Sequence, residues 1–161
     1  MGLTNTSQQR LAVGDVAPEF TLTAGNSIRV SLRDVLATGR RAVVAFYVFD
    51  FSGDCTNEWA QLESMMEDFE ESHARVLGIS VDSRHAHAAY ARILGISAPL
   101  LSDFNKEVAE AYGVLTDLGE LRGVARRSVF VVNPDGKLSY VWEAEKPSDL
   151  PNFQEVLAAV R

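Results

Sequence analysis

The chain has 161 residues, of which 47% are hydrophobic and 23% charged, and its formal net charge is -7. This length is enough for one well-buried core and short for two, so we expect a single domain over residues 1–161. The acidic balance argues against a nucleic-acid-binding surface, and no apolar stretch in the sequence is long enough to cross a membrane.

The N-terminal part of the chain predicts a short β-hairpin. Residues 1–12 are polar and are expected to be flexible. Residues 13–22 form a turn and an extended segment. Gly25 and the asparagine after it are typical of a hairpin turn, and residues 27–31 alternate apolar and polar side chains as a strand does. A short helix is expected over residues 32–37.

The stretch from Arg41 to Phe69 organises the chain. Residues 41–49 form a continuous apolar run rich in β-branched and aromatic side chains, which predicts an interior strand of a parallel or mixed sheet. A polar turn over residues 50–54 then leads to Cys55. Beyond the cysteine, apolar residues recur at spacings of three and four, which predicts one face of a helix: Trp59, Leu62, Met66 and Phe69.

A second buried strand is predicted over residues 75–81. Asp82 or Ser83 can cap a following helix over residues 84–94, and this strand-helix-strand order predicts parallel strands. Three shorter features come next: a brief strand at 99–102, a helix at 106–112 and a loop at 114–123.

The C-terminal third predicts an antiparallel hairpin and a last helix. Two apolar runs, 127–133 and 137–142, flank the turn at 134–136, and an amphipathic segment covers residues 148–160. The order of all these elements resembles the thioredoxin-like fold, which is an α/β fold. We therefore expect a central mixed sheet flanked by helices, with an N-terminal β-hairpin extension.

Cys55 is the only cysteine, so an internal disulfide is excluded and a reducing cytoplasm is the expected location. It stands where a strand turns into a helix. Unpaired backbone N–H groups and the positive end of the helix dipole favour a thiolate at such a position. The alternative is a small buried hydrophobic residue, as most free cysteines are. A thioredoxin-type dithiol is excluded, because Glu58 occupies the place of the second cysteine.

The residues around this thiol resemble the active-site loop of peroxiredoxins (the AhpC/TSA family), whose pattern is Pro-x-x-x-Thr/Ser-x-x-Cys. Ser52 lies three residues before Cys55, as the family's hydroxyl does, and Glu58 also fits, whereas Val48 stands where the family has proline. Further segments match the family in the same order: 14–22, 78–83, 99–103, 111–114 and 127–136.

This resemblance implies a thiol-dependent peroxidase that reduces hydrogen peroxide or organic hydroperoxides. Cys55 would be the peroxidatic nucleophile and would become a sulfenic acid. Ser52 would hydrogen-bond the thiolate and the peroxide. Arg127 would stabilise the thiolate and the charge on the departing oxygen, and Glu58 could orient Arg127. The residues expected to line the substrate pocket are Val48, Gly53 and Asp54.

Because the sequence holds no resolving cysteine, the resemblance is to one-cysteine peroxiredoxins, in particular the AhpE or bacterioferritin-comigratory-protein groups. An external thiol would recycle the enzyme, either a low-molecular-weight thiol or a thioredoxin- or glutaredoxin-like protein. The resemblance requires no cofactor and no metal. Exposed aromatic residues near the site could support a homodimer. The alternative function is a non-catalytic peroxide sensor or holdase that relays oxidation of Cys55 to a partner.

Two further pairs of residues have simple interpretations. His85 and His87 lie two apart on a predicted helix and so face different directions, which favours polar surface over a metal site. Met65 and Met66 fall within the apolar stripe of their helix, which favours packing over a redox pair.

Overall fold

The structure is a computed structural model that describes residues 10–161. The prediction that residues 1–12 are flexible therefore falls mostly outside the described residues. Where the description begins, the Arg10 guanidinium donates to the Glu143 carboxylate at 2.6 Å, which ties residue 10 to the last strand of the sheet.

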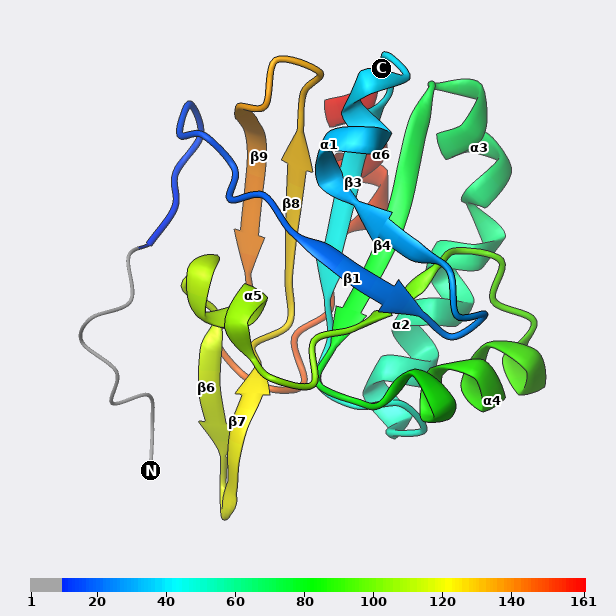
Figure 1. The fold of residues 1–161 in the computed structure, drawn as a ribbon, viewed down its shortest axis with the longest axis vertical. Coiled ribbons are helices and arrows are strands. Elements are labelled where there is room, and N and C mark those ends of the chain that lie inside the picture. The colour runs from blue at the N-terminus through cyan, green and yellow to red at the C-terminus, as the bar shows by residue number, and fades with distance from the viewer. Residues whose placement is uncertain (1–9) are drawn as a thin grey trace.

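Among residues 10–161, seven strands form one mixed sheet in the order β2-β1-β5-β4-β3-β8-β9 (Figure 1). The three central strands β3, β4 and β5 are parallel, and β8 runs antiparallel to β3. The N-terminal hairpin pairs with β5, so it extends the main sheet. The bounds are β1 Thr21–Ala24, β2 Arg29–Ser31, β3 Arg41–Phe46, β4 Ala74–Ser80, β5 Leu100–Ser102, β8 Ser128–Val132 and β9 Leu138–Glu143.

Helices cover both faces of this sheet, as the sequence predicts. Side chains of α1 and α5 pack into the core on one face, and those of α2, α3, α4 and α6 pack into the core on the other. In the described part of the chain, none of the helices is long and apolar enough to span a membrane. Their bounds are α1 Leu32–Ala37, α2 Gly53–Ser64, α3 Met66–Glu71, α4 Arg84–Leu94, α5 Glu107–Ala111 and α6 Phe153–Val160.

Strand β3 is shorter than the predicted run of residues 41–49. It is buried between β4 and β8 and ends at Phe46, although the Tyr47 N–H still donates to Ile79 O at 3.0 Å. The chain then leaves the sheet, and the Asp50 N–H donates to the Asp82 carboxylate instead of a strand neighbour. Apolar residues thus continue past the strand into the turn, which the hydrophobic pattern alone could not separate from the strand.

The predicted helix after Cys55 is two helices, α2 and α3, joined at Met65 (φ -106°). The predicted apolar stripe still faces the core, with Trp59, Leu62 and Phe69 buried. Met65 and Met66 are half-buried against the same cluster, so the prediction that they pack is confirmed. Neither glycine nor proline marks the break, so no local pattern in the sequence indicates it.

Two other boundaries differ from the predictions. Residues 114–123, expected to be a loop, contain a separate hairpin of β6 (Leu115–Leu118) and β7 (Leu121–Ala125) that projects below the sheet in Figure 1. The C-terminal helix begins at Phe153, not at residue 148, because the Asn152 side chain caps it by accepting from the Gln154 and Glu155 N–H groups.

Candidate active site

The candidate thiol lies at the start of α2, as predicted. Ser52 has extended backbone angles (φ -77°, ψ 149°) and is the N-cap residue, and its carbonyl accepts the first helical hydrogen bond from the Thr56 N–H at 2.9 Å. Cys55 therefore falls in the first turn, where free N–H groups and the helix dipole favour an anion. Its side chain is completely buried.

Arg127 reaches this thiol from the start of β8, a strand that runs antiparallel to β3. It directly precedes β8, whose first residue, Ser128, pairs with Phe46 at the end of β3. The amino end of β8 and the carboxyl end of β3 thus meet at one edge of the sheet. There Arg127 Nη1 lies 3.1 Å from Cys55 Sγ and 2.7 Å from Glu58 Oε1, and all three side chains are buried.

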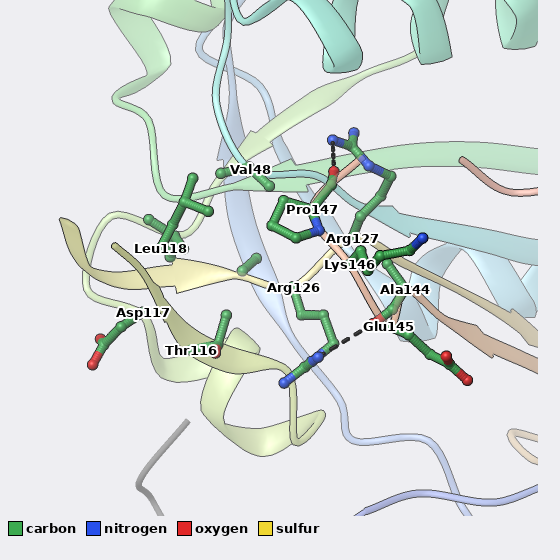
Figure 2. A pocket seen from close by; sticks show the side chains of 12 residues that line it. Val48, Thr116, Asp117, Leu118, Arg126, Arg127, Ala144, Glu145, Lys146 and Pro147 are labelled. Atoms are coloured by element: carbon green, nitrogen blue, oxygen red, sulfur yellow. Dashed lines mark hydrogen bonds between the residues drawn. The ribbon is translucent and has the colours of Figure 1, made fainter. Parts of the chain in front are cut away.

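The neighbouring Arg126 points elsewhere, because successive residues of an extended chain face opposite sides. Its Nη1 donates to Ala144 O at 3.2 Å, whereas Arg127 Nη2 donates to Pro147 O at 3.2 Å; Figure 2 shows the two side chains diverging. Of these two guanidinium groups, only that of Arg127 contacts the sulfur.

One cation faces two acidic groups in this buried site. Burial raises the pKa of Glu58 to about 7, and the attraction of Arg127 opposes this only in part. Burial lowers the pKa of Arg127, but the charges of Glu58 and Cys55 outweigh it, so that its pKa is raised. Two buried polar atoms, Glu58 Oε2 and Arg127 Nε, have no hydrogen-bond partner within residues 10–161. The site therefore has polar atoms that a ligand could satisfy.

The other predicted site residues surround the thiol less closely. The Ser52 hydroxyl is half-buried and donates to Phe49 O at 3.2 Å. Gly53 and Asp54 are exposed, so the charge of Asp54 is solvated and opposes a thiolate less than a buried charge would. Val48 is nearly buried and belongs to the same apolar cluster as Cys55.

A cavity of about 200 Å³ opens beside Arg127 (Figure 2). Val48 lines it together with residues of the β6-β7 hairpin and of the segment after β9. Its walls are mainly apolar, and Arg126, Lys146, Asp117 and Glu145 add charges. The cavity thus touches both Arg127 and Val48, while Cys55 lies behind its lining.

The expectation that His87 is polar surface is wrong, although His85 is exposed as expected. His87 is fully buried, with its Nδ1 2.7 Å from Asp50 Oδ2. Its place on α4, three residues before the buried Tyr90, was a signal for the inner face of the helix. Its partner Asp50 comes from a turn, and no local pattern pairs the two residues.

Three comparisons relate this chain to known proteins. The AhpC/TSA family model matches residues 13–141. The chain belongs to the AhpC/TSA family. Alkyl hydroperoxide reductase E of Mycobacterium tuberculosis is 34% identical over 155 residues, which are 93% of this chain and 98% of that protein. A chloroplastic 2-cysteine peroxiredoxin of Chattonella marina is 36% identical over 142 residues, 81% of this chain and 69% of the other.

Solved structures show the same fold. The peroxidoxin BcpB of Mycobacterium tuberculosis superposes with a TM-score of 0.84 at 27% identity, covering 94% of this chain and 97% of that one. The predicted thioredoxin-like fold is thus confirmed. The AhpC/TSA protein described here is a thiol-dependent peroxidase, and its single cysteine fits the one-cysteine type.

Proposed function

We propose that Cys55 is the peroxidatic nucleophile of this peroxidase and that Arg127 holds it as a thiolate. The observation that carries this proposal is the contact of 3.1 Å between Arg127 Nη1 and Cys55 Sγ at the start of α2. A free thiol has a pKa of about 8.5 and is mostly protonated at neutral pH. A buried guanidinium together with a helix N-terminus favours the ionised form, which is the nucleophile.

The reaction follows from this arrangement. The Cys55 thiolate attacks the terminal oxygen of a hydroperoxide, an S–O bond forms and the O–O bond breaks. The sulfur is oxidised to a sulfenic acid, and the peroxide is reduced to an alkoxide or hydroxide, which takes up a proton to give an alcohol or water. Arg127 stabilises the negative charge as it moves from sulfur to the leaving oxygen.

Ser52 is the proposed hydroxyl partner of the thiolate and the peroxide. It is the N-cap residue of α2, yet within the described residues its hydroxyl accepts from no helix N–H group and donates only to Phe49 O. That single bond of 3.2 Å is easily exchanged, so rotation of the side chain can present the hydroxyl to the sulfur or the substrate. Gly53 and Asp54 contribute the backbone of the same helix turn.

We propose that hydrogen peroxide or organic hydroperoxides approach through the cavity lined by Val48, Arg127 and Pro147. Val48 packs in the same cluster as Cys55, and Arg127 contacts both the cavity and the sulfur. Glu58 positions Arg127, because its Oε1 accepts from the same nitrogen that faces the thiol.

The oxidised enzyme needs a thiol from outside, because the chain contains one cysteine. The proposed reductant is a low-molecular-weight thiol or a thioredoxin- or glutaredoxin-like protein of a reducing compartment such as the cytoplasm. Its sulfur would attack the sulfenic acid, so that an S–S bond forms, the S–O bond breaks and water leaves; a second thiol then reduces this mixed disulfide and frees the Cys55 thiol. Since Cys55 is completely buried, the start of α2 must open for a protein reductant to reach the sulfur.

The test is steady-state consumption of hydrogen peroxide with excess dithiothreitol. Wild type should turn over, Cys55→Ser should be inactive, and Arg127→Ala should be strongly impaired. Activity retained by Cys55→Ser would refute the proposal. Stoichiometric oxidation of Cys55 without turnover would refute it too, and would instead support a peroxide sensor or holdase.

A further inference from the structure

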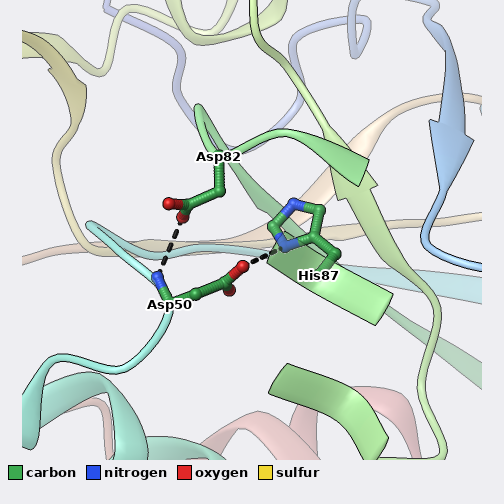
Figure 3. Close-up of side chains that lie close together, drawn as sticks. All are labelled: Asp50, Asp82 and His87. Atoms are coloured by element: carbon green, nitrogen blue, oxygen red, sulfur yellow. Dashed lines mark hydrogen bonds and ion pairs between the residues drawn. The ribbon is translucent and has the colours of Figure 1, made fainter. Parts of the chain in front are cut away.

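The turn between β3 and α2 carries a buried carboxylate that the reaction above does not use. Both oxygens of Asp50 accept hydrogen bonds: Oδ1 from the Tyr47 hydroxyl at 2.6 Å and Oδ2 from His87 Nδ1 at 2.7 Å (Figure 3). The side chains of Asp50 and His87 are almost fully buried. A buried carboxylate needs such partners, since an unpaired one would be very costly.

The hydrogen bonds of His87 define its protons. Its Nε2 lies 3.0 Å from the backbone carbonyl of Leu101, which can only accept, so Nε2 carries a hydrogen. Its Nδ1 faces the carboxylate of Asp50, so a proton also lies between these two atoms. The two side chains therefore form a buried hydrogen-bonded pair that links the turn before α2 to helix α4 and strand β5.

The backbone of Asp50 is held at the same corner. Its N–H donates to Asp82 Oδ2 at 2.9 Å, and the same oxygen accepts from the Ser80 hydroxyl at 2.5 Å. Asp82 follows β4, so the main chain of Asp50 is attached to the β4-α4 connection, while its side chain is attached to α4 itself through His87. Figure 3 shows Asp82 and His87 on two sides of Asp50.

The side chains of this cluster already use one another and the backbone as hydrogen-bond partners. Asp50, Asp82 and His87 each place one potential ligand atom within 4.8 Å of the others. A histidine ligand must offer a ring nitrogen lone pair, however. Both ring nitrogens of His87 already face protein oxygens, Nδ1 that of Asp50 and Nε2 that of Leu101, so hydrogen bonds within the protein occupy both.

The next residue shows why this turn needs an anchor. Phe51 has φ +67°, in the left-handed region that bulky residues rarely adopt. Such a conformation persists only where the surroundings enforce it. Phe51 is followed by Ser52, the N-cap of α2, and its ring packs edge-on against Tyr90 of α4 with centroids 4.9 Å apart. Asp50 fixes the chain on the other side of the strained residue.

We propose that the Asp50–His87 pair is a positioning device for the active site: it holds the strained turn at Phe51 and thereby keeps the first turn of α2 in register with Arg127. The role as an active-site device rests on the proposed function of Cys55. Without the pair, Phe51 relaxes to a common backbone conformation, and the start of α2 moves away from the guanidinium and opens more often.

Two measurements on Cys55 then change in opposite directions. Oxidation by hydrogen peroxide requires the closed arrangement, so its second-order rate constant falls in Asp50→Ala, by roughly tenfold or more, since a misplacement of about 1 Å can cost that much. Modification by a bulky maleimide requires opening, so its rate rises. The maleimide reaction does not depend on any peroxidase activity.

Asp50→Asn is the conservative variant. Its amide can donate to His87 Nδ1 while its oxygen still accepts from Tyr47, so the hydrogen-bonded geometry is kept without the carboxylate. We expect it to restore both rates toward the wild-type values. Val132→Ala is the control for stability, because Val132 is buried in the core on the opposite face of the sheet. All variants are compared at equal distance from their thermal midpoints.

The proposal is overturned if Asp50→Ala changes the two rates no more than Val132→Ala does, or if Asp50→Asn is as impaired as Asp50→Ala. If wild-type Cys55 does not react with peroxide but the maleimide rates follow the expected order, the proposed function fails while the positioning of α2 stands. If wild type reacts with peroxide and Asp50→Ala reacts at the same rate, the positioning role is refuted while the proposed function of Cys55 stands.

Discussion

Arg127 Nη1 lies 3.1 Å from Cys55 Sγ, although 72 residues separate the two in the chain. The antiparallel pairing of β3 with β8 brings them together, because Arg127 directly precedes β8 and the turn after β3 leads into α2, whose first turn carries Cys55. The same nitrogen donates to Glu58 Oε1 at 2.7 Å. A change at any of the three side chains must therefore affect the other two.

Replacing Arg127 by alanine tests this coupling through activity. We expect peroxidase activity to fall by about 10²–10³, as when one donor to a developing negative charge is removed. Arg126→Ala is the comparison variant, because that guanidinium also lines the cavity but donates to Ala144 O and not to the sulfur, so we expect a much smaller loss. Steady-state kinetics of the two variants give the comparison, and equal losses in both would contradict a special role of Arg127.

The same variant should be less stable. Removing Arg127 leaves the Glu58 carboxylate buried without its ion-pair partner, which costs about 3 kcal/mol. The double variant Arg127→Ala/Glu58→Gln should recover much of the free energy of unfolding but none of the activity. Urea unfolding measures the first quantity, and recovery of activity in the double variant would show that Arg127 is not required.

The raised pKa of Glu58 predicts that the free energy of unfolding depends on pH. Burial raises its pKa from 4.5 to about 7, so between these values the folded state binds more protons than the unfolded state. Stability therefore falls as pH rises through this window, by about 3 kcal/mol for this group. Glu58→Gln should lose this contribution, and parallel pH profiles of unfolding free energy in the two proteins would refute it.

The sequence could predict those features that depend on local pattern. Residues 42–46 are wholly apolar, and the parallel strand they predict is confirmed; Ser83 caps α4 as predicted, and Gly95 closes it in the left-handed conformation. Cys55 and Glu58 share one helix face by their spacing of three. The contact with Arg127 depends on strand pairing across the chain, so only the family resemblance pointed to it.

Other features could not be predicted because their signals are weak or non-local. The β6-β7 hairpin turns at Gly119 (φ +58°), and its strands of four and five residues, Leu115–Leu118 and Leu121–Ala125, are too short to stand out as periodic patterns. The hydrogen bond of Asp50 with His87 joins a turn to a helix, and only the fold shows that both are buried.

Val48 should control access to the thiol from the cavity. Val48→Ala removes two methyl groups between the cavity and the cluster that contains Cys55, so the passage widens. We expect the ratio of the rate constant for cumene hydroperoxide to that for hydrogen peroxide to rise severalfold. Leu118→Ala, on the hairpin side of the cavity, is the control; the same rise in both variants would assign the effect to cavity volume alone.

Gly78 should be required for the packing of α2 on the sheet. A Cβ there would collide with the Trp59 indole and lie 2.8 Å from Leu100 Cδ2. Gly78→Ala should lower the free energy of unfolding by about 2 kcal/mol or more, as overpacking does. Thermal unfolding and the fluorescence of Trp59 report the change. An unaltered thermal midpoint would mean that α2 is not held against β4 in this way.

The most direct test of the central claim is the ultraviolet absorbance of the Cys55 thiolate at neutral pH, with Cys55→Ser as the blank. Wild type should show a largely ionised thiol, and Arg127→Ala should show a much smaller thiolate signal at the same pH, while Arg126→Ala should match wild type. An equal thiolate signal in wild type and Arg127→Ala would contradict the claim that this guanidinium holds the sulfur in its reactive form.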